Sequence, residues 1–139
     1  MNAIDTNVFV YALDAAEPAK QAKAREFFRR VLTSNESILV PWQVAVELLA
    51  RLRKWESAGR IIGDDVHARF KEFLGVWTLA VPTAEIFDRS FRLRDRYLLS
   101  HWDSLLIAAC QEASVTRLYT EDMQHGADYD GVNIVNAFA

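Results

Sequence analysis

Short apolar runs alternate with longer stretches of helical periodicity along this chain. The short runs are rich in aliphatic and β-branched residues, and we expect strands at residues 2–5, 37–40, 78–81, 117–120 and 132–135. In the longer stretches apolar side chains recur every three to four residues, and we expect helices at about 6–13, 18–33, 42–55, 65–77, 84–99 and 102–113. Such an alternation favours a parallel sheet with helices on both faces.

Helix starts are marked by residues with defined backbone or capping preferences. Pro18, Pro41 and Pro82 all lie where a helix should begin. Asp64 or Asp65 can cap the helix that we expect to end near residue 77. Thr83 can cap the next helix, which we expect to end near residue 99. No repeat or linker interrupts the alternation, so we expect one α/β domain over residues 1–139 with a sheet of four or five strands.

Composition limits the class of protein further. Of 139 residues, 51% are hydrophobic, which excludes intrinsic disorder and allows a sizeable core. The single cysteine, Cys110, excludes a disulfide framework and a cysteine-based zinc site. No apolar run approaches the roughly 20 residues of a membrane span, and no signal-peptide pattern opens the chain. We therefore expect a soluble cytoplasmic protein without a membrane partner.

The charge balance argues against a generally basic nucleic-acid binder. The formal net charge is −3 at pH 7, from 16 basic and 19 acidic residues. A chain with this balance can bind phosphates only through a local group of cations or through a bound metal ion. Arg51 and Lys54 share a helix face with Glu47, so they either contact phosphate groups of a ligand or form part of a solvated face.

Acidic residues stand at the positions where open parallel sheets build their sites. Asp5 follows the first expected strand, and Glu121 and Asp122 follow the fourth. Because sites in such sheets form at the carboxyl ends of the strands, these side chains are expected close together. Glu47 and Asp103 each interrupt an apolar helical segment, so the fold can bring them to the same edge.

Each of these acids also has an ordinary structural explanation. Asp5 can cap the helix that follows it. Glu47 can pair with Arg51, four residues later on the same helix. Asp103 comes three residues after Ser100, in the pattern of a capping box, and the acid after the fourth strand can be a turn residue.

The combination of the acids favours a metal site. Two carboxylates about 4 Å apart repel by about 4 kcal/mol at an effective dielectric constant of 20. A cluster must therefore either hold protons, with raised pKa values, or bind a hard divalent cation. Mg²⁺ prefers carboxylate oxygens and retained water, so it fits such a cluster.

The segments that carry these acids resemble, in chain order, the motifs of PIN-domain ribonucleases, specifically the VapC toxins of bacterial toxin–antitoxin pairs. The resemblance covers essentially the whole chain. The matching segments are Ile4–Ala12, Val46–Leu48, Trp102–Ala109, Tyr119–Gly126 and Gly131–Asn136.

The resemblance implies a three-layer α/β/α fold and hydrolysis of an RNA phosphodiester with Mg²⁺, or alternatively Mn²⁺. The catalytic and metal-binding residues would be Asp5, Glu47, Asp103 and Asp122. Asp5 and Asp103 are the first choices for direct ligands, and the alignment favours Asp122 over Glu121. Residues expected either to hydrogen-bond these carboxylates or to act only as local caps are Thr6, Asn7, Ser104 and Thr120. The implied partners are an RNA substrate, a VapB-like antitoxin and a second copy of the chain.

Other classes of protein share some of these sequence features. A PIN-like module that binds without turnover, or a PIN nuclease that is not a toxin, would carry the same motifs. A phospho-acceptor receiver domain needs a lysine at a later strand end, and all the lysines here fall in expected helices. A haloacid-type phosphatase needs Asp-x-Asp after the first strand, where this chain has Asp5-Thr6-Asn7.

Overall fold

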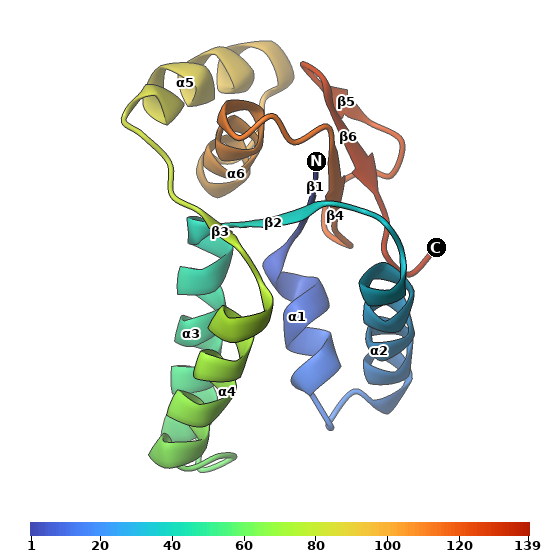
Figure 1. Ribbon diagram of the computed structural model, residues 1–139. Helices are drawn as coiled ribbons and strands as arrows, with labels where there is room; N and C mark the ends of the chain where they lie inside the picture. The colour runs from blue at the N-terminus through green and yellow to red at the C-terminus, as the bar shows by residue number, and fades with distance from the viewer.

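The computed structural model describes residues 1–139 and is mixed α/β, with a central and mostly parallel sheet (Figure 1). The strands are β1 (Asn2–Ile4), β2 (Ile38–Pro41), β3 (Leu79–Ala80), β4 (Arg117–Tyr119), β5 (Asp128–Tyr129) and β6 (Val132–Val135). The helices are α1 (Thr6–Leu13), α2 (Pro18–Thr33), α3 (Trp42–Ser57), α4 (Gly63–Val76), α5 (Glu85–Tyr97) and α6 (His101–Glu112). No helix combines the length and the apolar character needed to cross a membrane.

The strand order is β3-β2-β1-β4-β6-β5, and only β5 runs antiparallel to its neighbour. In the parallel pair β1 and β4, Ile4 lies opposite Tyr119. The chain leaves β1 toward β2 on one side, whereas β4 pairs on the other side of β1. The carboxyl ends of β1 and β4 therefore meet at a topological switch point, where open α/β sheets form their binding crevices.

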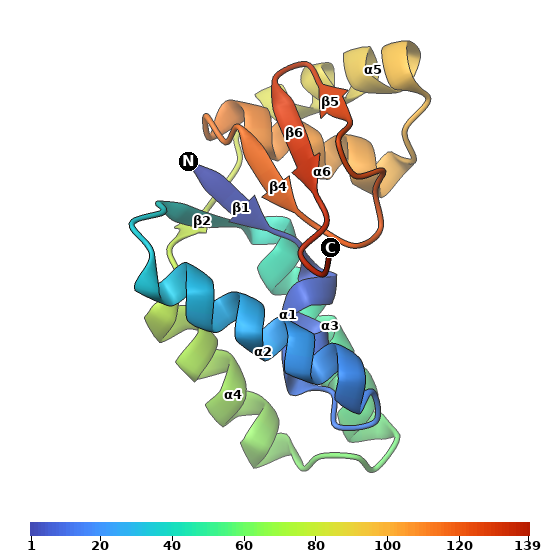
Figure 2. The same cartoon turned by 90° about the vertical axis from the view of Figure 1, so that its right-hand side faces the viewer.

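Helices lie on both faces of the sheet, as the alternation of the sequence predicts. Figure 2 shows α6 behind β4 and β6, with α5 packed beside α6, whereas α2 lies below the strands and in front of α1 and α3. Side chains from three adjacent strands fill the core between these layers, since Ile4, Leu118 and Ile134 are fully buried. A group of aromatic side chains between α1 and α4 extends this core. The ring centroid of Phe9 on α1 lies 5.1 Å from that of Phe73 and 5.5 Å from that of Trp77.

The five expected strands are present, and the sheet has one more. The additional strand β5 pairs with β6 as a hairpin whose turn contains Asp130 and Gly131, both with positive φ (50° and 99°). Two positive φ angles are typical of a type I′ turn, for which Asp-Gly is a preferred sequence. The dipeptide was thus a usable signal for a hairpin that the periodicity missed.

One expected helix cap is wrong. The residue before α4 is Ile62, which offers no capping side chain, and Asp64 and Asp65 lie inside the first turn. The residue before α5 is Ala84, so this helix starts slightly later than Pro82 indicates. The Thr83 hydroxyl accepts from the backbone N–H of Glu85 at 3.3 Å, as a cap does, and it also donates to Glu112 Oε2 at 2.7 Å, because the end of α6 lies against this connection.

Candidate active site

The acids expected from the sequence, Asp5, Glu47, Asp103 and Asp122, line one cleft of about 650 Å³. They come from the end of β1, from α3, from the first turn of α6 and from the loop after β4. Asp5 and Asp122 lie together because β1 and β4 end side by side at the switch point. The N-terminal parts of α3 and α6 bring Glu47 and Asp103 to the same cleft.

Asp5 is the most buried of these acids, with 7% of its surface exposed. Its Oδ1 accepts from the backbone N–H of Thr6 at 2.7 Å and so caps α1, and its Oδ2 accepts from the Thr120 hydroxyl at 2.9 Å. Burial raises the pKa of Asp5 to about 6, and the nearby charges of Glu47 and Asp122 add to the effect, although both hydrogen bonds oppose it. The capping interpretation is correct, but it does not explain why a carboxylate is kept in this position.

Thr120 connects the acid at β1 with the loop that follows β4. It is fully buried, and while its hydroxyl donates to Asp5, its oxygen accepts from Asn7 Nδ2 at 3.2 Å and from the backbone N–H of Asp122 at 3.1 Å. Since Ile4 and Tyr119 are register partners, the residues after them are held side by side. Thr120 thus hydrogen-bonds the Asp5 carboxylate directly, whereas Asn7 is connected to it only through Thr120.

Glu47 is held by two donors from different elements. Its Oε2 accepts from the Thr6 hydroxyl at 2.8 Å and its Oε1 from Gln43 Nε2 at 2.9 Å. Gln43 Nε2 also donates to the backbone carbonyl of Trp102 at 3.2 Å, so it links α3 to the start of α6. The expected Glu47–Arg51 pair is absent. Gln43 is not predicted from the sequence, in which its only signal is its position one turn before Glu47.

Asp103 lies in the first turn of α6, where its backbone N–H donates to the capping Ser100 Oγ at 3.1 Å. Partial burial raises the pKa of its carboxyl, and the charges of Asp122 and Glu47 add to this shift while Ser100 opposes it. Ser104 makes no bond to the acids, because its buried hydroxyl donates to the carbonyl of His101 at 2.7 Å within the helix. For Ser104 the local interpretation is therefore the correct one.

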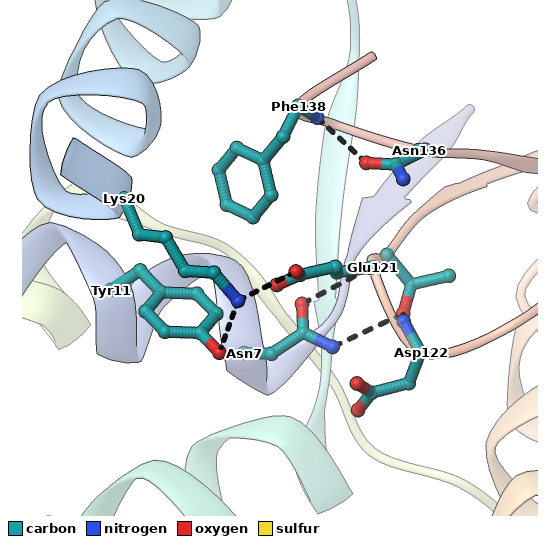
Figure 3. Close-up of polar contacts among 8 residues, drawn as sticks. Asn7, Tyr11, Lys20, Glu121, Asp122, Asn136 and Phe138 are labelled. Carbon is teal, nitrogen blue, oxygen red and sulfur yellow. Dashed lines mark hydrogen bonds and ion pairs between the residues drawn. The ribbon is translucent and has the colours of Figure 1, made fainter. Parts of the chain in front are cut away.

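Glu121 and Asp122 face different surroundings, as Figure 3 shows. The Glu121 carboxylate points to Lys20, whose Nζ lies 2.8 Å from Oε1 and also donates to the Tyr11 hydroxyl at 3.1 Å. The other oxygen of Glu121 is buried without a hydrogen-bond partner. Asp122 lines the cleft, whereas Glu121 does not. The geometry therefore favours Asp122 as the fourth acid of the cleft.

Comparison with known proteins agrees with this arrangement, since residues 3–127 match the model of the PIN domain family. The chain belongs to the PIN domain family. No curated protein sequence matches it.

Solved structures similar to this PIN domain are of toxin–antitoxin proteins. One is in a toxin–antitoxin complex from Klebsiella pneumoniae, with a TM-score of 0.71, 17% identity, and coverage of 99% of this chain and 98% of that one. Another belongs to VapBC of Rickettsia felis bound to a DNA fragment from its promoter, with a TM-score of 0.70, 15% identity and 96% coverage of both chains. A third is a sarcin–ricin-loop-cleaving VapC toxin of Mycobacterium tuberculosis, with a TM-score of 0.65, 14% identity and coverage of 88% and 90%. At these identities the likeness establishes the fold.

The donor set of this PIN domain suits a hard cation. The side chains of the cleft that can donate a lone pair to a metal are carboxylates, amides and hydroxyls, with no histidine or cysteine among them. His125 lies in the loop after β4, where its Nδ1 accepts from the backbone N–H of Asn136 at 2.9 Å. No group of three acidic, histidine or cysteine side chains is close enough to hold an ion by itself. Mg²⁺ commonly binds through only one or two carboxylates and retained waters, so the residues present fit a hydrated divalent cation.

Proposed function

We propose that this chain is a Mg²⁺-dependent ribonuclease that hydrolyses RNA phosphodiester bonds, and that it is the VapC-type toxin of a toxin–antitoxin pair. The observation that carries the proposal is the convergence of Asp5, Glu47, Asp103 and Asp122 on one cleft of a PIN domain. The similar solved structures support the toxin assignment, since they are described as a sarcin–ricin-loop-cleaving toxin and as toxin–antitoxin complexes.

Asp5 and Asp103 would hold the cation, which can also be Mn²⁺, while Glu47 and Asp122 bind it directly or through water or orient the attacking water. The cation would supply a water of lowered pKa and neutralise charge on the phosphate. Thr6, Gln43 and Thr120 keep the carboxylates in place by hydrogen bonds of 2.8, 2.9 and 2.9 Å. Fixing ligand carboxylates in this way is the usual role of the groups behind a metal site.

The same proposal includes an antitoxin partner that silences the nuclease, and a homodimer. An arginine or lysine of the antitoxin that entered the acidic cleft would compete with the cation for the carboxylates. Closed symmetric dimers are the most frequent oligomers of soluble proteins. Co-expression of the toxin with the neighbouring reading frame, followed by measurement of the mass of the purified complex, tests both parts.

The decisive experiment compares Asp103→Asn with Asp95→Asn, a matched change of an exposed acid on α5 that lies outside the cleft. We expect induction of the unchanged protein and of Asp95→Asn to arrest growth and to produce new RNA 5′ ends at defined sites. Asp103→Asn should lose both effects, because one carboxylate of the cleft is removed. Growth arrest that persists in Asp103→Asn contradicts the proposal. A folded protein that binds Mg²⁺ but cleaves no RNA favours a binding module instead.

A further inference from the structure

Two cations on α3, Arg51 and Lys54, line the same cleft as the acids. Both side chains are exposed, and neither forms an ion pair or a side-chain hydrogen bond. The other cations around the cleft are engaged. Lys20 is paired with Glu121 at 2.8 Å, and Arg60 is paired with Asp14 at 2.7 Å. The two α3 cations are thus the ones that a ligand in the cleft can reach without breaking an ion pair.

The freedom of Arg51 follows from the hydrogen bonds of Glu47. An acid and an arginine four residues apart on a helix ordinarily attract each other. Here Thr6 and Gln43 each donate to one oxygen of Glu47, and no ion pair forms between Glu47 and Arg51. The neighbouring Arg53, by contrast, is paired with Glu56 at 3.2 Å. The helix therefore separates a paired cation outside the cleft from unpaired cations that line it.

Helix geometry places both cations in line with Glu47. At 3.6 residues per turn, positions 47, 51 and 54 share one face, and a rise of 1.5 Å per residue puts them about 6 Å and about 10 Å along the axis from Glu47. A strand with one phosphate at the acids would therefore bring its following phosphates near Arg51 and Lys54.

We infer that Arg51 and Lys54 form a phosphate-binding wall of the cleft, which holds the backbone of a single-stranded RNA segment beside the bond to be cut. The inference rests on the proposed ribonuclease function. An acidic cleft in a protein of net charge −3 repels RNA, so local cations are needed to hold the strand. The guanidinium of Arg51 can bind a phosphate through two parallel hydrogen bonds, and Lys54 adds a point charge. Asp14, the neighbouring acid of the cleft wall, is neutralised by Arg60.

The test combines cleavage kinetics with RNA binding by the full chain. The variant is Arg51→Gln/Lys54→Gln, and the control is Lys71→Gln/Arg92→Gln, which removes one Lys and one Arg from exposed positions outside the cleft. Glutamine has nearly the same helix propensity as both residues, so the fold should be kept, which circular dichroism checks. Binding is followed by fluorescence anisotropy of a labelled single-stranded oligoribonucleotide of mixed sequence, with Asp103→Asn as the common background so that the RNA stays intact.

We expect KM to rise about tenfold in the cleft variant while kcat changes less than twofold, because the contacts are equal in the ground and transition states. The slope of log K against log salt should become shallower by about 1.4, from about 0.7 for each lost phosphate contact on a single strand. The single variant Arg51→Lys keeps both positive charges and should therefore keep most of the salt slope of the unchanged protein. The control variant should match the unchanged protein in all three quantities.

Several outcomes overturn the phosphate-binding wall. They are an unchanged KM and salt slope in the cleft variant, an equal loss in the control variant, and an absence of RNA binding by the background protein. Failure of the proposed function looks different. If the unchanged protein cleaves no RNA at any Mg²⁺ concentration, the anisotropy series still decides the inference, because weaker binding with a shallower slope supports the wall even then.

Discussion

Asp5 has two roles whose energetic demands oppose each other. As the cap of α1 it accepts a hydrogen bond from Thr6, which favours the folded state. As a buried carboxylate next to Glu47 and Asp122 it is costly to ionise, which raises its pKa to about 6. A neutral cap would serve the helix better at neutral pH. The carboxylate is therefore explained by the site and not by the stability of the helix.

The first prediction concerns Asp5→Asn in the absence of divalent cations. Because the pKa of Asp5 rises from 3.8 to about 6 on folding, the folded state binds the proton more tightly. This contribution to stability is fully present below about pH 4 and is lost as the pH rises through 6. Asn has no such proton, so the variant should be more stable than the unchanged protein at pH 8, by at most about 3 kcal/mol.

Urea unfolding at pH 5 and pH 8 with a chelator present measures this difference. The gain of Asp5→Asn should be larger at pH 8 than at pH 5, and Asp95→Asn measures the effect of the same substitution at an exposed position outside the cleft. An Asp5→Asn protein that is equally destabilised at both pH values contradicts the assigned cause. Cleavage activity should be lost in Asp5→Asn even though the protein is more stable.

The second prediction concerns the Thr120 hydroxyl, whose bond to Asp5 lowers the pKa of that acid against the effect of burial. Thr120→Val removes the donor and leaves a buried carboxylate oxygen without it, at a cost of about 1–3 kcal/mol. The pKa of Asp5 should then rise above about 6, whereas Thr120→Ser keeps the hydroxyl and should leave it near that value. A carboxyl-detected NMR titration distinguishes the two, and equal titration curves in both variants contradict the role of the hydroxyl.

At the scale of elements, α6 depends on its first turn both for its stability and for its part in the cleft. Ser100 Oγ accepts from the backbone N–H of Asp103, and the carbonyl of Trp102 accepts from Gln43 on α3. The cap of the helix is thus bonded to the backbone of the acid itself, and the residue before the acid is bonded to α3. A substitution of the capping residue is therefore expected to change the position of the Asp103 carboxylate in the cleft.

The third prediction is that Ser100→Ala destabilises the protein by about 1 kcal/mol, because one N–H at the helix start loses its acceptor. Ser100→Thr keeps a hydroxyl acceptor and should cost only a few tenths of that. Urea denaturation of the two variants measures the difference. In Ser100→Ala the cleavage rate should fall more than the stability loss alone explains, since Asp103 is held less firmly; an unchanged rate contradicts the link between cap and acid.

The elements were predictable where a single local cause determines them. The strand and helix core positions follow from apolar periodicity, and Pro18 starts α2 as expected. Contacts between distant segments were not predictable. Thr83 accepts from the N–H of Glu85 at the start of α5, as expected of a cap, but its second partner, Glu112, lies nearby only in the fold. The hairpin of β5 and β6 was different, since Asp130-Gly131 signalled its turn locally.

At the scale of the whole molecule, the topology assembles the cleft. The switch point between β1 and β4 brings Asp5 and Asp122 together; the sequence predicted a parallel sheet with acids at its strand ends, but the strand order that makes these two strands neighbours comes from the structure. Gln43 and Lys20 could not be foreseen in the same way. Gln43 bridges α3 and α6, and Lys20 reaches from α2 to the loop after β4, so their partners depend on how elements pack and not on spacing along the chain.

The fourth prediction follows from the convergence of the acids across these elements. A cation that binds only the folded chain stabilises it by mass action, by about 2.7 kcal/mol when the free concentration is 100 times Kd. The unchanged protein should therefore show a rising Tm as Mg²⁺ is added after chelation, and Mn²⁺ should do the same. Sodium at equal ionic strength is the control for screening of the repulsion among the acids.

Paired substitutions test whether this stabilisation comes from the cleft. Asp5→Asn/Asp103→Asn should show no rise in Tm with Mg²⁺, because it lacks the two carboxylates proposed as direct ligands, whereas Asp95→Asn should respond as the unchanged protein does. Since Asp5→Asn alone is expected to raise the stability without metal, the quantity to compare is the increment on adding Mg²⁺ and not the Tm itself. An increment retained in the double variant would place the cation elsewhere on the molecule. An increment equally produced by sodium would mean that screening, and not coordination, relieves the acids.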